Sequence, residues 1–211
     1  MEFLSVMEII GTIAFAVSGA LVAIEKGLDY YGIAILAVIT AVGGGMIRDV
    51  LINLELPVAL ANPMYVLISI GAAVLTIVFY KRITRYRNVL LVFDAVGLAA
   101  FTAIGAQAAL NHHVYTPFVV VTMAILTGTG GGILRDVFAK EVPFVFRKEV
   151  YAVACIIGAC SFISAHYFLK NGQISMYIAF GITLLIRLAA VKLNWHLGRV
   201  KSIEEINEEG I

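Results

Sequence analysis

The sequence has few charged residues for its length. Asp, Glu, Lys and Arg make up 14% of the 211 residues, whereas 61% of the residues are hydrophobic. A soluble domain needs more charge than this to hydrate its surface. The net charge of +1 also provides no overall basic bias toward nucleic acid. We therefore expect an integral membrane protein that is surrounded by lipid and does not bind nucleic acid.

Cysteine and histidine are also scarce. The two cysteines, Cys155 and Cys160, are five residues apart in an apolar block and should point to different faces of a helix. This spacing predicts two free thiols rather than a disulfide or a metal site. The sequence contains no Ser/His/Asp or paired-His constellation, and His112 and His113 are expected in solvent. We therefore expect no enzyme activity, no cofactor and no bound metal.

Long apolar blocks are abundant instead. About 20 residues of helix cross roughly 30 Å of hydrocarbon, and seven such spans can be placed. The first block begins almost at Met1 without a basic segment before it, so it is expected to be a retained helix rather than a cleaved signal. Pro57 and Pro143 are expected to close the second and fifth spans, and Pro63 to begin the third. The expected spans are about 4–24, 30–54, 63–80, 89–110, 115–139, 150–169 and 174–194.

Basic residues gather on one side of the expected spans. If the spans alternate in direction, eleven of the fifteen Lys and Arg residues lie on one side, and Lys170 alone lies on the other. By the positive-inside rule, the N-terminus is then outside and the C-terminus cytoplasmic. Arg187, inside the seventh span, is expected to snorkel or to pair at an interface. The eleven are Lys26, Lys81, Arg82, Arg85, Arg87, Lys140, Arg147, Lys148, Lys192, Arg199 and Lys201.

The chain repeats itself at a spacing of 86 to 87 residues. Each copy carries three spans, so the second copy should enter the membrane from the opposite side. Inverted repeats of this kind are typical of transport proteins. They predict an all-α membrane protein with seven transmembrane helices, in the units 1–88, 89–170 and 171–211, the last holding the unpaired seventh helix. Two matched patterns carry the repeat: Glu8-x-x-Gly11-x-x-x-Phe15-x-x-x-Gly19-Ala20 with Asp94-x-x-Gly97-x-x-x-Phe101-x-x-x-Gly105-Ala106, and Gly43-Gly44-Gly45-x-x-Arg48-Asp49-Val50 with Gly130-Gly131-Gly132-x-x-Arg135-Asp136-Val137.

The glycine triplets lie in the middle of the second and fifth spans. Each glycine costs a helix roughly 1 kcal/mol relative to Ala, and the triplet lets the backbone bend or unwind. We expect Gly43 to Gly45 and Gly130 to Gly132 to kink these helices and to expose backbone to a pore. The alternative is close helix packing through small residues. The second triplet lacks the strand and the Gly-Lys-Ser/Thr of a nucleotide-binding loop.

Charged residues follow both triplets directly. Charge at this depth usually marks a functional site with a partner. Because neighbouring residues of a helix point about 100° apart, Arg48 and Asp49 are not expected to face one another, nor are Arg135 and Asp136. Glu8 and Asp94 are candidate partners, with Arg48 pairing with Glu8 and Arg135 with Asp94, or the reverse. The charges could form a gate or static ion pairs.

Two aromatic residues lie between glycines on the first and fourth spans. Phe15 and Phe101 each share a helical face with one glycine before them and one after them. Such a stripe is typical of a close helix contact. Alternatively, the two rings could narrow a pore.

The doubled GGGxxRDV motif, with a proline near the end of each span, resembles the bacterial and archaeal branch of the trimeric intracellular cation (TRIC) channel family, whose domain is also labelled a glycine transporter. The resemblance covers spans one to six. It implies a homotrimer in a prokaryotic plasma membrane, with lipids and monovalent cations as partners and a potassium and sodium path through each protomer. Kinked second and fifth helices would line that path. A carrier of a small zwitterion such as glycine is the alternative.

Overall fold

All secondary structure in the described part of the chain is helical. The computed structural model describes residues 6–86, 88–112, 115–147, 150–193 and 195. Seven of its helices are long and apolar enough to cross a membrane, which confirms the seven expected spans. In chain order the helices are α1 (Val6–Glu25), α2 (Tyr30–Leu51), α3 (Val58–Ala61), α4 (Met64–Ile83), α5 (Val89–Asn111), α6 (Pro117–Phe138), α7 (Phe144–Arg147), α8 (Val150–Leu169) and α9 (Gly172–Leu193).

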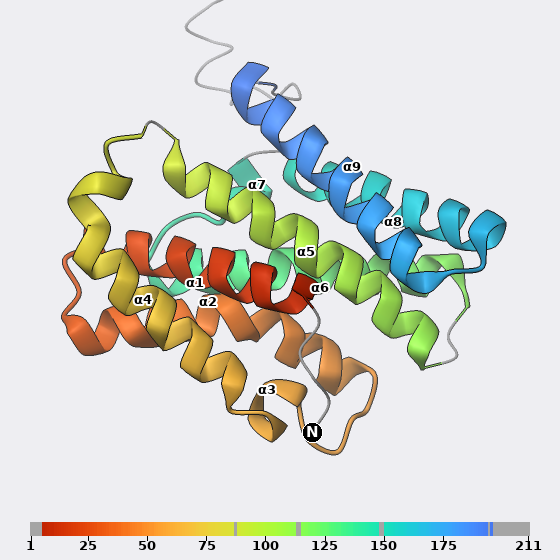
Figure 1. Cartoon of the computed structure of the whole chain (residues 1–211), viewed down its shortest axis with the longest axis horizontal. Helices are drawn as coiled ribbons and strands as arrows, with labels where there is room; N and C mark the ends of the chain where they lie inside the picture. The colour runs from red at the N-terminus through yellow and green to blue at the C-terminus, as the bar shows by residue number, and fades with distance from the viewer. Residues whose placement is uncertain (1–5, 87, 113–114, 148–149, 194, 196–211) are drawn as a thin grey trace, which may run out of the picture.

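The helices form two equivalent sets around a shared centre. Helices α1 and α5 pack side by side in the middle and are the most buried of the seven long helices. Helix α2 packs against α1, and α6 packs against α5. Helices α4 and α8 are mostly exposed and lie at opposite sides of the bundle (Figure 1). Helix α9 packs on α5 and α8 and completes the expected fold of two inverted three-helix repeats plus one helix.

Both glycine-bearing helices end in the same way. Helix α2 ends at Leu51, three residues before the expected boundary, and α6 ends at Phe138. Asn53 and Lys140, at equivalent positions of the two repeats, have positive φ angles of 59° and 58°. Their amides and the amides that follow them bond back to carbonyls of the last helical turn. This left-handed cap terminates a helix because the chain can no longer follow the helical path.

Two short helices follow the caps. Sequence reasoning placed Pro57 and Pro143 at the ends of spans, but each proline is followed instead by a four-residue helix, α3 or α7. These helices pack against the ends of α2 and α6 respectively. The boundaries expected at residues 88 and 170 fall in the connections between α4 and α5 and between α8 and α9. The division into units 1–88, 89–170 and 171–211 stays a prediction.

Small residues let the central helices approach closely. A Cβ atom on Gly11 would lie 2.9 Å from the Cβ of Ala100, and one on Gly105 would lie 2.6 Å from the carbonyl oxygen of Met123. The Gly-Phe-Gly stripes are therefore helix contact surfaces, as one of the two interpretations predicted. Cys155 is buried and Cys160 is exposed, and both thiols are free. Their placement on different helix faces is confirmed.

Two of the loops expected on the basic side contact one another. Lys26, after α1, forms an ion pair with Glu141, after α6, and Arg147 lies 3.5 Å from the same carboxylate. The hydrogen bond and charge of Lys26 lower the pKa of Glu141. These contacts place two of the basic loops at the same end of the bundle. Arg87, His113, Lys148, Arg199 and Lys201 lie outside the described residues.

Candidate functional site

Helices α2 and α6 meet at their glycine triplets. A Cβ atom on Gly44 would lie 3.1 Å from the amide nitrogen of Gly131, and one on Gly130 would lie 3.0 Å from the Cα of Gly44. A Cβ atom on Gly131 would collide with the carbonyl oxygen of Thr40. Both helices continue as α-helix through the triplets. The backbone is therefore not unwound at the triplets, and at these three glycines the structure supports the packing interpretation. The expected kink, with backbone exposed to a pore, stays a prediction.

One glycine of the first triplet faces open space. Gly45 is half-buried, and the nearest atom to a Cβ built on it is the Nη2 of Arg48, 3.9 Å away. Gly45 lines a void shared with Arg48. Its counterpart Gly132 is buried against the hydroxyl of Tyr151, 2.7 Å from a Cβ at that position. The two repeats therefore differ at their third glycine.

Arg48 pairs with its own neighbour. Its Nε and Nη2 donate to Asp49 Oδ1 at 2.8 and 2.6 Å. The expectation that these neighbours would not face one another is wrong, because the long arginine side chain turns back along the end of α2. The Arg48 side chain remains 11% exposed, and that of Asp49 is 1% exposed. Whether Arg48 also pairs with Glu8 stays a prediction.

Arg135 has more partners and no exposed surface. Its Nε donates to Asp136 Oδ1 at 2.8 Å, again a neighbour pair that the sequence argument did not expect. Its Nη1 donates to Asp94 Oδ1 at 2.7 Å, which confirms the Arg135–Asp94 pair. The same Nη1 donates to Ser18 Oγ, on α1. The Cζ of Arg135 also lies 4.9 Å from the centre of the Phe144 ring.

Each aspartate of the repeated motif also holds a short helix. Asp49 Oδ2 accepts a hydrogen bond from the amide of Val58, and Asp136 Oδ2 accepts one from the amide of Phe144, both at 2.8 Å. Amides at the beginning of a helix lack hydrogen-bond partners within the helix. These carboxylates therefore supply acceptors for the first amides of α3 and α7. Sequence reasoning missed this role. The signal was an aspartate followed at nearly constant spacing by Pro57 or Pro143 in both repeats.

Two tyrosines extend the carboxylate clusters. The hydroxyl of Tyr151 donates to Asp94 Oδ1 at 3.3 Å. Tyr65, 86 residues earlier, has a side-chain hydrogen bond with Glu8, the counterpart of Asp94. Arg187 is 2% exposed, with its Cζ 4.6 Å from the centre of the Tyr151 ring. Of the two expectations for Arg187, snorkelling to the surface is therefore wrong. Both tyrosines were missed, although the repeat spacing relates them.

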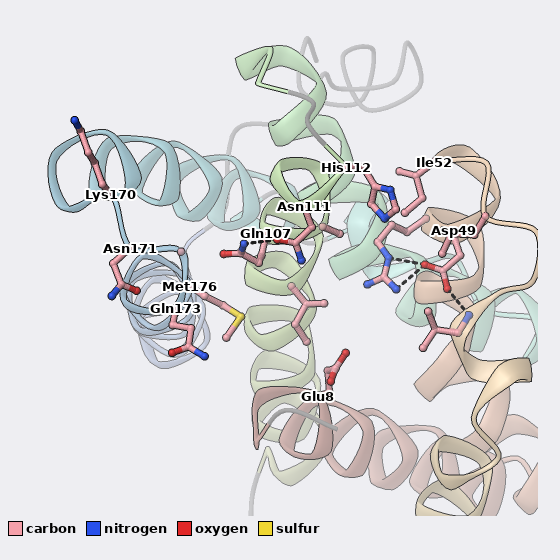
Figure 2. A pocket seen from close by; sticks show the side chains of 16 residues that line it. Glu8, Asp49, Ile52, Gln107, Asn111, His112, Lys170, Asn171, Gln173 and Met176 are labelled. Atoms are coloured by element: carbon pink, nitrogen blue, oxygen red, sulfur yellow. Dashed lines mark hydrogen bonds and ion pairs between the residues drawn. The ribbon is translucent and has the colours of Figure 1, made fainter. Parts of the chain in front are cut away.

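A polar cavity opens at one end of the bundle. Its volume is about 740 Å³, and it lies between the ends of α2 and α5 and the beginnings of α1 and α9. Figure 2 shows Asp49 on the right, at the end of α2, and Glu8 below, at the beginning of α1, with side-chain amides from α5 and from the beginning of α9 around the rest. Lys170 and His112 also line it. The lining polar side chains include Glu8, Arg48, Asp49, Gln107, Asn111, Asn171 and Gln173.

The polar cavity leads toward an aromatic pair at the centre. A smaller void of about 30 Å³ shares Glu8, Arg48 and Asp49 with the cavity and is also lined by Gly45 and Phe101. It has room for a water molecule. Phe101 stacks on Phe15, with ring centres 5.3 Å apart and ring planes at 26°. Phe15 is 1% exposed and would contact a Cβ atom on Gly131. The two rings thus separate the void from the α6 triplet.

Taken together, these features define a polytopic helical membrane protein whose inverted repeats enclose a polar cavity and buried ion pairs. A family model described as "Glycine transporter" matches residues 5–81 and 91–167, one match for each repeat. The chain belongs to this family, which includes the TRIC channels.

Relatives and solved structures match over most of the chain. The inner membrane protein YadS of Escherichia coli is 41% identical, over 90% of this chain and 92% of its own length. The membrane protein YvgT of Bacillus subtilis is 36% identical, over 90% and 93%. A solved structure described as the structural basis for conductance through TRIC cation channels has a TM-score of 0.85 at 35% identity. The match covers 93% of this chain and 97% of the chain in that structure. The TRIC orthologue of Rhodobacter sphaeroides has a TM-score of 0.83 at 35% identity, over 90% and 97%.

Proposed function

We propose that this chain is a monovalent cation channel that conducts potassium and sodium ions through each protomer of a homotrimer. The observation that carries the proposal is the polar cavity, which leads through Gly45 to the stacked pair of Phe15 and Phe101. Its support from relatives is the similarity to solved structures described as TRIC cation channels. The second and fifth transmembrane helices, α2 and α6, would line the path.

The charges beside Arg48 suit a cation. An unpaired arginine in a protein interior would raise a barrier of several kcal/mol to a passing cation. Arg48 does not stand alone, because Asp49 accepts two of its hydrogen bonds. Glu8 adds a second carboxylate to the same cavity. These three residues together carry one negative charge, which favours a cation beside them, whereas Lys170, which also lines the cavity, brings the formal charge of the whole lining to zero.

The path is closed at its centre and beyond. The stacked rings of Phe15 and Phe101 obstruct it, and on the far side Arg135 is buried among Asp94, Asp136 and Ser18. Conduction requires that the rings separate and that the Arg135 cluster rearrange. The residues of the predicted site thus fall into two groups. Glu8, Arg48 and Asp49 border the polar cavity, and the residues around Arg135 are buried.

Orientation and assembly follow from charge and from relatives. The cavity lies at the end that carries Lys170, opposite the end of Lys26 and Glu141. By the positive-inside rule the cavity end is outside with the N-terminus, and the Arg135 end is cytoplasmic with the C-terminus. A homotrimer is proposed because the Rhodobacter sphaeroides relative is described as a trimeric channel. The membrane is proposed to be a bacterial plasma membrane, as the Escherichia coli relative is an inner membrane protein.

A carrier of a small zwitterion such as glycine is the second candidate. It is favoured by the description of the family and by the presence of Arg48 and Glu8 in one cavity. A guanidinium can bind a carboxylate, and a carboxylate can bind an ammonium group. The same cavity could therefore hold both ends of an amino acid.

Single-channel recording of the purified protein in planar bilayers separates the two candidates. Discrete unitary currents that reverse at the potassium equilibrium potential in a potassium gradient support the channel. Saturable, gradient-driven uptake of labelled glycine into proteoliposomes, without unitary currents, supports the carrier. Gly45→Leu should reduce the current because it fills the void, whereas Gly71→Leu is the matched control, since a side chain at Gly71 meets nothing within 4 Å.

A further inference from the structure

The two repeats carry different basic residues where their first helices end. In α1 and α5 equivalent residues lie 86 positions apart, as Glu8 and Asp94 do, so Lys26 corresponds to His112. Lys26 follows α1 at the end of the bundle opposite the polar cavity, whereas His112 follows α5 and lines the cavity. A lysine keeps its charge over the physiological pH range, and a histidine does not.

The residues that follow the second helices differ in a matching way. Asn53 and Lys140, the positive-φ residues after α2 and α6, are 87 positions apart, so Leu54 corresponds to Glu141. Glu141 forms an ion pair with the lysine after α1. Leu54 and His112 both line the polar cavity. The ion pair that joins the two repeats at one end is therefore replaced, at the cavity end, by an apolar residue and a histidine.

His112 lies where a positive charge is favoured. It is the C-cap of α5, and its amide donates to the carbonyl oxygen of Ala108. The last carbonyl groups of a helix give this end a partial negative charge, which attracts a cation. The side chain of His112 is exposed, and Figure 2 shows it between the end of α5 and the end of α2. A proton can therefore reach it from the solvent in the cavity.

The charge of His112 decides the sign of the cavity lining. The other charged residues around the cavity are Glu8 on α1, Arg48 and Asp49 on α2, and Lys170 before α9. Helix α5 contributes side-chain amides to the same lining. With His112 neutral, the two carboxylates and the two cations balance. Protonation of His112 gives the lining a formal charge of +1.

We propose that His112 is a proton-binding residue that controls cation entry into the polar cavity, so that acid on the cavity side lowers the cation current. This inference rests on the proposed channel function. One added charge at roughly 10 Å in water lowers the local cation concentration about twofold. Salt screens such an interaction, so the effect should be larger in dilute salt than in concentrated salt.

The first test is the unitary current in planar bilayers in about 20 mM potassium chloride, where screening is weak. Wild-type current should fall about twofold when the cavity side is changed from about pH 7.5 to about pH 5.5, the range in which histidine titrates. His112→Gln should keep the higher current at both pH values, and His112→Lys should have the lower current at both. The fall should shrink in about 1 M salt.

Two other histidines provide matched controls. His113 is the next residue in the sequence, and His166 is half-buried on α8. His113→Gln and His166→Gln should each retain the wild-type fall in current. The proposal is overturned if His112→Gln also retains it or if His113→Gln abolishes it. A fall confined to pH values below about 5 overturns it as well, because carboxylates titrate there.

The second test does not depend on conduction. Gln173 lines the cavity and is exposed, so Gln173→Cys can be labelled in a Cys160→Ala background, in which the remaining Cys155 is buried. Its reaction rates with a positively and a negatively charged methanethiosulfonate are measured at both pH values. The ratio of the two rates cancels the titration of the thiol itself.

That ratio should fall about fourfold on acidification, twofold for each reagent, and should stay constant when His112→Gln is added. A ratio that does not change with pH while His112 is present overturns the proposal, whether or not the protein conducts. Absence of unitary currents in wild type would instead contradict the channel, and the labelling rates would still decide whether His112 sets the charge of the cavity.

Discussion

Removing the charge of Arg135 should destabilise the protein far more than removing that of Arg48. The side chains of Arg135 and Asp94 are both fully buried, and that of Asp136 is 4% exposed. Arg135→Gln would leave two carboxylates in the interior without their common cation. Removing one partner of a buried ion pair costs roughly 3–5 kcal/mol. For a chain of this length this corresponds to a fall of about 10 °C in the unfolding midpoint.

Arg48→Gln should cost less, because Arg48 borders a cavity that water can enter. The side chain of Arg48 is 11% exposed, and water can replace part of its interaction with Asp49. The loss of a hydrogen bond to a charged group in such a place is about 1–2 kcal/mol. Arg147→Gln provides the control, because Arg147 is 45% exposed and lies 3.5 Å from Glu141. It should leave the midpoint almost unchanged.

The assay is thermal unfolding of the assembled protein in detergent, followed by size-exclusion chromatography of each variant. The double variant Arg135→Gln/Asp94→Asn should lose less unfolding free energy than the two single variants lose together. The difference, which is the coupling energy, should be roughly 1–3 kcal/mol. Arg48→Gln should alter conductance more than stability. A midpoint for Arg135→Gln equal to that of Arg147→Gln would refute the reasoning, because the buried cluster would then contribute no more than a surface charge.

Three other outcomes are expected. Gly44→Ala should prevent assembly or lower the unfolding midpoint, because its Cβ would collide with the carbonyl oxygen of Thr127. Gly45→Ala should be tolerated, and the yields of folded protein should distinguish the two variants. Phe101→Ala should increase unitary current by removing one ring of the stacked pair, and an unchanged current would place the path elsewhere. Lys26→Gln should raise the pKa of the Glu141 carboxyl toward its usual value, which carbon NMR of labelled glutamate can measure. Because Lys26 lowers that pKa, the pair contributes to stability above the usual glutamate pKa and loses its contribution as the pH falls through the lowered value.

Hydropathy and spacing were sufficient for the architecture. A membrane span needs about 20 apolar residues whatever surrounds it, so all seven helices could be located from the sequence, with errors of a few residues at their ends. The Arg135–Asp94 pair was one of the two pairings that the sequence allowed, because a buried arginine requires an acid and both Asp94 and Glu8 were available on central helices. The repeat itself depends only on the order of residues.

The arrangement of side chains around the two arginines depended on the tertiary structure. The sequence could not show that Arg48 turns back to Asp49, because an arginine side chain has several rotatable bonds and its direction is set by what packs around it. Nor could it show that Gly44 is pressed against α6 while Gly45 faces a void, since adjacent residues of one motif differ only in the face they present. Ser18 lies 117 residues from Arg135, and only the packing of α1 against α6 brings them into contact. The sequence alone therefore determined which segments cross the membrane, whereas helix packing decided where the polar cavity lies and which of the two arginines is fully buried.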